Sequence, residues 1–430
     1  METIETSAMR KVTRRFMPLL FISFVAAFLD RVNVGFAALT MNQELGLSSS
    51  VFGLGAGLFF LTYFIFEVPS NLALERFGAR RWITRIMMTW GLIAGAMAFI
   101  QGPTSFYVLR LLLGAAEAGF GPGIMFFLTL WFPAGYRARA LGYFFVAMPF
   151  ASVIGAPISG LLVSIDGFMG LKGWQLMFLV EALPTIILGA VVWYRLTDRP
   201  ADADWLSERE KQWLMTTLAT EKQQHGATNP RHGSALANPY AWALGLIFFG
   251  IAGLNYGMSF FLPQIIHAFN FSLRMTGLIG AVPFLFASVC MIWWGKRSDA
   301  REERLMHTLL PQILAISGLA ISTVVAIPLM KLALITIACG GIFSAIVVFW
   351  AFATGHLAPS QAAAGVALIN CVGNLSGFVD PLLIGKIKDL TGSYDGGLQT
   401  LAGIGAVAAF ALGALAYGSR RRTPSSPAYD

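Results

Sequence analysis

Between two long apolar runs stands a short basic segment, residues 71–81, with the sequence NLALERFGARR. A second such segment, residues 295–304 with the sequence GKRSDAREER, stands between two later apolar runs. The acidic residues Glu75 and Asp299 lie 224 positions apart, and arginines follow both. This recurrence favours an internal repeat, in which each half of the chain carries the same loop at the same place. The alternative is two unrelated basic loops that align by chance.

Apolar runs recur along the whole chain of 430 residues, and each approaches the roughly 20 residues that a helix needs to cross a bilayer. We predict twelve membrane-spanning helices, at 16–40, 51–73, 82–101, 105–132, 138–165, 174–195, 240–266, 274–294, 306–328, 332–357, 361–385 and 398–418. The predicted fold is an all-α membrane protein with two six-helix pseudo-repeat bundles. The first bundle is 1–195, a cytoplasmic linker follows at 196–238, and the second bundle with a basic tail is 239–430. Within the linker, Ser207 and Glu210 match a capping box that opens a short helix.

The composition excludes an ordinary soluble domain. Hydrophobic residues make up 56% of the chain and charged residues only 12%, about half the share of roughly 25% in soluble proteins. The cysteines Cys290, Cys339 and Cys371 are widely spaced inside apolar runs, so they match neither a metal nor a disulfide pattern. No loop carries a phosphate-binding, nucleophile or metal motif. We therefore expect no cofactor, no metal and no enzymatic activity.

The distribution of lysine and arginine predicts the orientation in the membrane. If the N-terminus is cytoplasmic, 23 of the 30 basic residues fall in cytoplasmic segments and five in outer segments. Both termini are then cytoplasmic, in a multi-pass protein of the plasma (inner) membrane. The same asymmetry accounts for most of the basic excess behind the net charge of +8, so that charge does not indicate a nucleic-acid partner. We expect a monomer in the lipid bilayer.

Two charged residues of the fourth run deserve a functional interpretation, because a charge at the bilayer centre costs about 2.5–3.5 kcal/mol on insertion scales. Arg110 and Glu117 are seven residues apart, which places them on one helix face roughly 10 Å apart along the axis. Gly114 and Gly121 share that face and allow a neighbour or a ligand to approach closely. Arg110 needs an anion and is therefore a candidate substrate contact, whereas Glu117 can be a counter-ion or a proton carrier. The alternative is an Arg–Glu network that only fixes helix packing.

Two further charges stand side by side in the first run. Asp30 and Arg31 are adjacent, so their side chains point about 100° apart and do not simply pair with each other. Arg31 facing a cavity offers a forked donor that suits a carboxylate, with Asp30 behind it as a proton-sensitive partner. The alternative is that both lie near the outer helix end in water.

In the second half, charges inside the predicted spans almost vanish, and neutral polar groups take their place. Asn255 lies 224 positions after Arg31, at the equivalent place of the repeat. The candidate contacts to a substrate in this half are Asn255, Tyr256, Trp350, Asn370 and Asn374. Asn370 and Asn374 share one helix face at a spacing of four and can bond to hydroxyls or to a second carboxylate oxygen.

Several motifs together resemble those of a known family. They are LDRVN at 29–33, FEVPSN at 66–71, the segment 110–123 ending in GPG, WFP at 131–133, DRP at 198–200 with WLS at 205–207, and NLSG at 374–377. The chain is similar over nearly its whole length to the major facilitator superfamily, and within it to the anion:cation symporter family of tartrate-, phthalate- and hydroxyphenylacetate-type permeases.

The resemblance implies uptake of organic anions together with protons. It implies that Arg31 and Tyr63 contact the substrate, that Asp30 and Glu117 carry protons, and that Arg110 couples to Glu117. The basic loops then form a gating motif, made of Glu75, Arg76, Gly78, Arg80, Asp299 and Arg301. Asn71 and Glu75 depart from the glycine and aspartate that the superfamily usually has, which puts the gate chemistry of the first loop in doubt.

Three hypotheses follow. The first is a proton-coupled symporter that imports a small carboxylate, such as a tartrate-like or aromatic acid, by alternating access. The second is a proton-driven exporter of drugs or metabolites with the same fold, for which neutral substrates would leave Arg31 dispensable. The third, a membrane sensor or enzyme, has no supporting motif.

Overall fold

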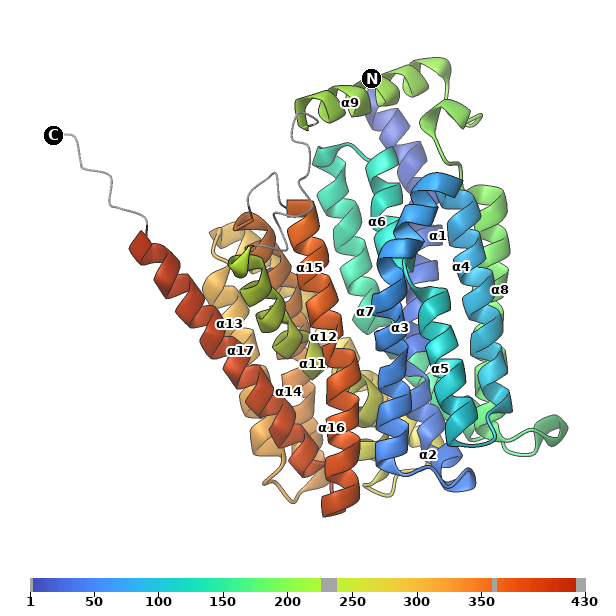
Figure 1. Cartoon of the computed structure of the whole chain (residues 1–430), viewed down its shortest axis with the longest axis vertical. Coiled ribbons are helices and arrows are strands. Elements are labelled where there is room, and N and C mark those ends of the chain that lie inside the picture. Colours follow the sequence, from blue (N-terminus) through green and yellow to red (C-terminus); the bar gives the residue numbers. More distant parts are fainter. Residues whose placement is uncertain (1–2, 226–237, 358–361, 423–430) are drawn as a thin grey trace. The chain divides into compact units, whose positions relative to one another are not determined.

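The computed structural model describes residues 3–225, 238–357 and 362–422 (Figure 1). Within these residues, twelve helical spans are long and apolar enough to cross a membrane, and each overlaps one of the twelve predicted runs. The prediction of an all-helical membrane protein is therefore confirmed. Residues 226–237 of the predicted linker and 423–430 of the predicted tail lie outside the described residues.

The chain divides into two compact units. Unit 1 comprises Met1–Asn229 and Ser259–Val282, and unit 2 comprises Pro230–Met258 and Pro283–Asp430. The helices of the first stretch are α1 (Ile4–Val32), α2 (Val34–Glu44), α3 (Ser49–Phe77), α4 (Ala79–Ala96), α5 (Pro103–Glu117), α6 (Phe120–Trp131), α7 (Ala134–Val163), α8 (Gly173–Arg195) and α9 (Glu208–His225). The later helices are α11 (Pro239–His267), α12 (Leu273–Arg301), α13 (Leu305–Ser322), α14 (Pro328–Gly355), α15 (Ala362–Asn374), α16 (Ser376–Thr391) and α17 (Asp395–Arg422). The predicted domains 1–195 and 239–430 stay a prediction.

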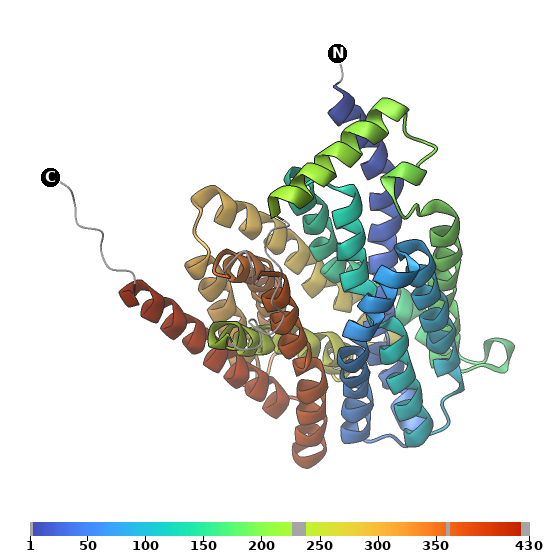
Figure 2. The same cartoon turned by 45° about the horizontal axis from the view of Figure 1, so that its top comes forward.

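Unit 1 is held together by close helix pairs, α3 with α5 and α4 with α8 (Figures 1 and 2). Glycines make the first pair possible. A β-carbon added at Gly114 would lie 2.1 Å from the carbonyl oxygen of Phe59, and one added at Gly55 would lie 2.1 Å from the ring of Phe106. Without side chains at these positions, the two backbones approach as closely as small-residue contacts in membranes allow.

Three of the spans are interrupted in the middle. The first breaks at Asn33, the fourth at Ala118 and Gly119, and the eleventh at Leu375. Gly119 has a φ of 85°, and a β-carbon there would lie 2.4 Å from the hydroxyl of Ser70, so both conformation and space require glycine. Discontinuous helices are typical of ligand sites in transporters, because the break frees backbone groups at membrane depth.

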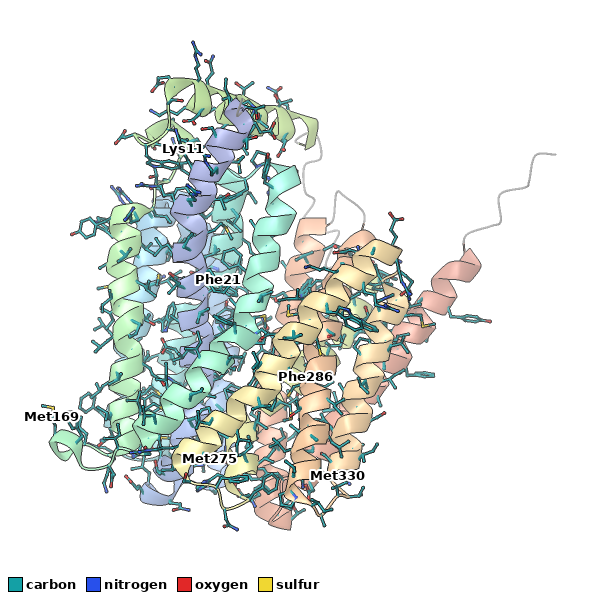
Figure 3. The ribbon with its side chains drawn as sticks, turned by 180° about the vertical axis from the view of Figure 1, so that it is seen from behind. Lys11, Phe21, Met169, Met275, Phe286 and Met330 are labelled. Carbon is teal, nitrogen blue, oxygen red and sulfur yellow. The ribbon has the colours of Figure 1, made fainter. Side chains whose placement is uncertain are left out.

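In unit 2, α13 packs against both α14 and α17. A β-carbon at Gly341 of α14 would lie 2.4 Å from the carbonyl oxygen of Pro311 in α13, so this pair is also closely packed. Large apolar side chains remain exposed on both units, such as Met275 in unit 1 and Phe286 and Met330 in unit 2 (Figure 3). Such surface suits lipid rather than water.

The helix α9 lies against the N-terminal part of α1 (Figure 1). The predicted capping box is confirmed, since the backbone N–H of Ser207 donates to Glu210 at 2.8 Å and that of Glu210 donates to the Ser207 hydroxyl at 3.4 Å. Glu210 also accepts from Ser7 at 2.7 Å and from Lys11 at 2.8 Å. Burial would raise the pKa of Glu210, but the Lys11 ammonium and these hydrogen bonds outweigh it and lower the pKa to about 2.

Candidate functional site

Arg31 of α1 forms an ion pair with Glu117, the last residue of α5. Arg31 is 9% exposed and Glu117 is 1% exposed, so the pair is almost removed from solvent. The second oxygen of Glu117 has no hydrogen-bond partner within the described chain. The sequence predicted both residues as site residues but paired Glu117 with Arg110 instead.

Aromatic rings surround the Arg31 guanidinium. Its central carbon lies 5.0 Å from the ring centre of Phe28 and 5.1 Å from those of both Phe59 and Tyr63, with Phe60 at 5.9 Å. Aromatic faces attract a cation, so these rings stabilise the buried guanidinium. Tyr63, predicted as a substrate contact, thus lies beside Arg31.

Arg110 does not pair with Glu117, the residue to which the sequence analysis coupled it. It is fully buried and donates to the backbone carbonyls of Gly55 at 3.2 Å and Ala56 at 2.9 Å. No hydrogen bond or ion pair joins it to Glu117 among the residues that the structure describes. The close contact of α3 and α5 explains this, because it brings bare backbone carbonyls of α3 within reach of the guanidinium.

Asp30, the proton-coupling candidate next to Arg31, has partners of its own. It accepts from the indole of Trp90 at 2.9 Å and from the hydroxyl of Thr185 at 2.8 Å, and it is 2% exposed. The prediction that Asp30 and Arg31 do not pair with each other is therefore confirmed. Sequence reasoning missed Trp90 and Thr185, although each is a polar group inside a predicted span.

Glu181 of α8 is a further buried acid of unit 1. Its carboxylate accepts from the amide of Asn33 at 3.0 Å and from the hydroxyl of Ser159 at 2.7 Å. These bonds tie the break of the first span to α7 and α8. Glu181 thus has the contacts of a scaffold residue.

Two of the five candidates in unit 2 are joined directly. The Tyr256 hydroxyl donates to the amide oxygen of Asn374 at 2.9 Å, beside the break of the eleventh span. Asn370 is half-buried one turn earlier in α15, and Asn255 is buried in α11. The ring of Trp350 lies 4.8 Å from that of Phe248.

One buried charge of unit 2 was overlooked. Asp380 of α16 is fully buried, and neither of its carboxylate oxygens has a hydrogen-bond partner within the described residues. The expectation that charges almost vanish from the spans of the second half is therefore incomplete. The signal was present, since Asp380 falls inside the predicted span 361–385.

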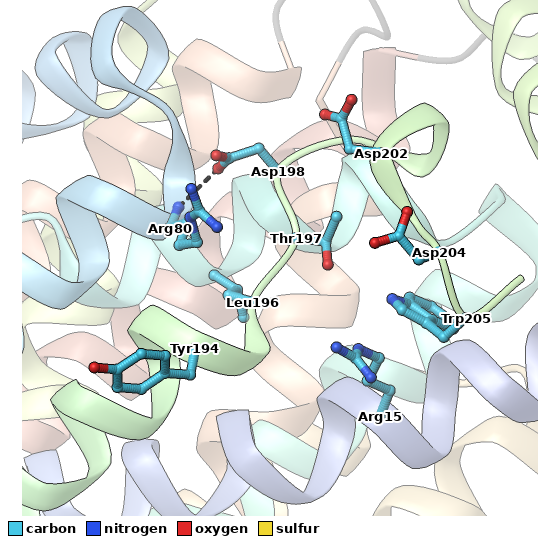
Figure 4. Close-up of a pocket in the computed structure, with 9 residues that line it drawn as sticks. All are labelled: Arg15, Arg80, Tyr194, Leu196, Thr197, Asp198, Asp202, Asp204 and Trp205. Carbon is cyan, nitrogen blue, oxygen red and sulfur yellow. Dashed lines mark hydrogen bonds between the residues drawn. The ribbon is translucent and has the colours of Figure 1, made fainter.

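The first predicted gate loop is bound by Asp198, a residue that the sequence analysis did not assign to the gate. Gly78, with a φ of 87°, precedes α4, and the backbone N–H of Arg80 donates to Asp198 at 2.8 Å. Figure 4 shows this bond at the rim of a pocket of about 320 Å³, which Arg15 and Trp205 also line. Asp198, which follows the C-terminal end of α8 in the sequence, thus caps the N-terminus of α4.

The remaining residues predicted for this gate, Glu75 and Arg76, are exposed. Arg76 lies over the ring of Phe77, 5.5 Å from its centre. Their part in gating stays a prediction.

The second gate loop has an ion pair within the loop itself. Asp299 pairs with Arg304 at 2.6 Å, whereas the predicted Arg301 is exposed. Glu303 caps α13 by accepting from the backbone N–H of Met306 at 2.7 Å and of His307 at 3.0 Å. Burial would raise the pKa of Glu303, but the hydrogen bond from the His307 ring and these N–H groups lower it overall. In both places a carboxylate caps the helix that follows the loop: Asp198 caps α4 and Glu303 caps α13.

Metal-ligating side chains do not cluster in the part of the chain that the structure describes. Within the described residues, no group of three or more histidine, cysteine, aspartate or glutamate side chains is placed to hold a metal ion. No disulfide joins Cys290, Cys339 or Cys371 among the residues that the structure describes.

Comparisons with known proteins agree with the fold. The family model described as Major Facilitator Superfamily matches residues 19–381. A protein of Agrobacterium vitis named "Putative tartrate transporter" is 49% identical and covers 93% of this chain and 89% of its own length. A "Quinolone resistance transporter" of Acinetobacter baumannii is 40% identical over 92% of this chain and 92% of its own length. Among solved structures, a bacterial homologue of the human lysosomal transporter Spinster has a TM-score of 0.75 at 16% identity, covering 95% of this chain and 98% of that one.

Proposed function

This chain belongs to the Major Facilitator Superfamily and is a multi-pass membrane transporter rather than an enzyme, and from this premise we propose that it is a proton-coupled symporter. Its proposed cargo is a small organic anion, such as a tartrate-like or aromatic acid, carried inward by alternating access. The proposed orientation has both termini in the cytoplasm, in the plasma (inner) membrane, and the working form is a monomer.

The ion pair of Arg31 and Glu117 carries this proposal. A buried guanidinium needs an anion, and in the present state Glu117 supplies it. A proton on Glu117 removes that negative charge and leaves Arg31 ready for the carboxylate of a cargo molecule. The aromatic rings around Arg31 keep water out and strengthen whichever anion contact is made.

Binding of the proton and binding of the cargo are thereby linked. The cargo carboxylate takes the place of Glu117 only after Glu117 is protonated, so each ligand favours the other. Asp30 is the second proposed proton carrier, since one of its oxygens has no partner within the described chain. Arg110 adds fixed positive charge nearby through its place on α5. The neutral groups of unit 2, Tyr256 and Asn374 among them, are proposed cargo contacts.

The test is uptake of radiolabelled carboxylic acids into proteoliposomes with an imposed inward proton gradient. A thermal-shift screen of acids on the purified protein first selects the cargo. Accumulation should follow the gradient, collapse with a protonophore and disappear in Arg31→Ala. Arg31→Lys is the matched variant that keeps the charge but not the planar fork. Accumulation of an acid that ignores the protonophore would refute the coupling.

A second candidate function is export of drugs or metabolites, and the relative named as a quinolone resistance transporter favours it. A neutral or zwitterionic cargo would not depend on the Arg31 guanidinium. Cells that express the chain would then resist such compounds, and Arg31→Ala would keep the resistance. The same variant thus separates the two functions.

A further inference from the structure

Asp380 is a buried carboxyl that stands apart from the other buried acids. The other buried acids all lie in unit 1 and all have a partner: Asp30, Glu117, Glu181 and Glu210 accept a hydrogen bond or pair with a cation, and Glu67 also has an interaction of its own. Asp380 lies in unit 2, is 0% exposed, and has no hydrogen-bond partner for either oxygen among the residues described.

The carboxyl of Asp380 is packed against the backbone of α11. A β-carbon added at Gly253 would lie only 1.9 Å from Asp380 Oδ2 and 3.3 Å from the β-carbon of Ser376. One turn further on, a β-carbon at Gly257 would lie 3.1 Å from Ile384. Two glycines of α11 therefore receive successive turns of α16, and the carboxyl is enclosed in that contact.

Among the described residues of unit 2, no cation donates a hydrogen bond to the Asp380 carboxyl. In its own helix the next charged residue is Lys386, six positions on, about 9 Å along the axis and on another side. Lys388, further on, donates to the carbonyl oxygen of Gly392, and Asp389 is exposed.

The other helices that contact α16 carry few titratable side chains within the described part of unit 2. The titratable side chains of α11 within unit 2 are Tyr240 and Tyr256, and that of α15 is Cys371. In α17, Asp395 at the first position pairs with Lys331, and the next titratable residue is Tyr417.

An ionised carboxylate without partners costs several kcal/mol to bury, and such groups normally hold a proton instead. A protonated carboxyl gains an O–H donor, which the backbone carbonyls of an adjacent helix are able to accept. We propose that Asp380 is a proton-binding site of unit 2, which holds its proton while α16 is packed on Gly253 and releases it when that contact opens. Its part in transport rests on the proposed symport, whereas its protonation does not.

The proton can be observed directly. Infrared difference spectra of the purified protein should contain the carbonyl stretch of a protonated carboxylic acid, shifted by deuterium exchange and absent in Asp380→Asn. Asp389→Asn is the matched control, because it removes an exposed carboxyl from the same helix. Spectra that are identical in wild type and Asp380→Asn across pH 5 to 9 would overturn the proposal.

Stability gives an independent readout. Ionisation of Asp380 is unfavourable only in the folded chain, so the wild-type melting temperature should fall as the pH rises, and Asp380→Asn should lose that part of the fall. Asp380→Ser is a second neutral variant in case the amide does not fit. Lower stability of both variants at every pH would show a partnered carboxylate and refute the proposal. Stabilisation of wild type, but not of Asp380→Asn, by sodium chloride over choline chloride at high pH would reassign the site to sodium.

Transport assays separate this inference from the proposed function. If the site takes part in coupling, Asp380→Asn should keep counterflow exchange but show an altered pH profile of uptake. If uptake proves independent of protons altogether, the proposed symport fails while the infrared band of Asp380 remains.

Discussion

Arg31 and Glu117 join α1 to α5 through an ion pair inside unit 1, next to the breaks at Asn33 and Gly119. Each residue is the ion-pair partner of the other, and the rings of Phe28 and Phe59 lie 5.0 and 5.1 Å from the central carbon of the guanidinium. A change in either residue therefore alters the charge balance of the whole site.

Removal of the cation should destabilise the protein and abolish transport. Arg31→Ala leaves Glu117 buried without a counter-ion, which typically costs about 3–5 kcal/mol of unfolding free energy. The double variant Arg31→Ala with Glu117→Gln should regain much of the melting temperature but none of the uptake. Recovery of uptake in the double variant would mean that Arg31 only balances Glu117 and does not bind cargo.

Removal of the titratable acid should uncouple transport from the proton gradient. Glu117→Gln keeps shape and hydrogen bonding but no longer exchanges a proton, so counterflow exchange should persist while gradient-driven accumulation is lost. Glu208→Gln, a change at an exposed residue of α9, is the control and should behave as wild type. Gradient-driven accumulation in Glu117→Gln at the wild-type level would contradict the assignment.

A single methyl group at Gly114 should disrupt unit 1. In Gly114→Ala the new carbon would lie 2.1 Å from the backbone of α3, so the helices must separate, at a typical cost of about 1–3 kcal/mol. Gly142→Ala is the matched control, because a β-carbon there meets nothing within 4 Å. The melting temperature should fall in the first variant and stay or rise in the second, and equal values would refute the close packing.

The attachment of α9 should depend on acid pH. The pKa of Glu210 is lowered to about 2 from an ordinary value of 4.5, so its contribution is fully present above pH 4.5 and is lost as the pH falls toward 2. Hydrogen exchange of the α9 amides should be faster in Glu210→Gln than in wild type at pH 7. The two should converge near pH 2, and a constant difference down to that pH would contradict the shift.

The spans followed from the sequence, because membrane helices need long apolar runs, and the charged candidates Asp30, Arg31, Arg110 and Glu117 inside those runs are buried. The partners of those charges did not follow. Arg110 and Glu117 both lie in α5, within one predicted span. That Glu117 pairs with Arg31 instead of Arg110 depends on how α1, α3 and α5 pack. Trp90 and Thr185 were missed for the same reason, since only tertiary structure brings two other helices, α4 and α8, to Asp30.

The contact at Gly114 also constrains motion. With no room for even one extra carbon, α3 and α5 cannot slide past each other or turn about their own axes without a steric clash. In any conformational change during transport, α3 and α5 therefore have to move together as one rigid pair. Bending is then confined to more loosely packed parts of the protein.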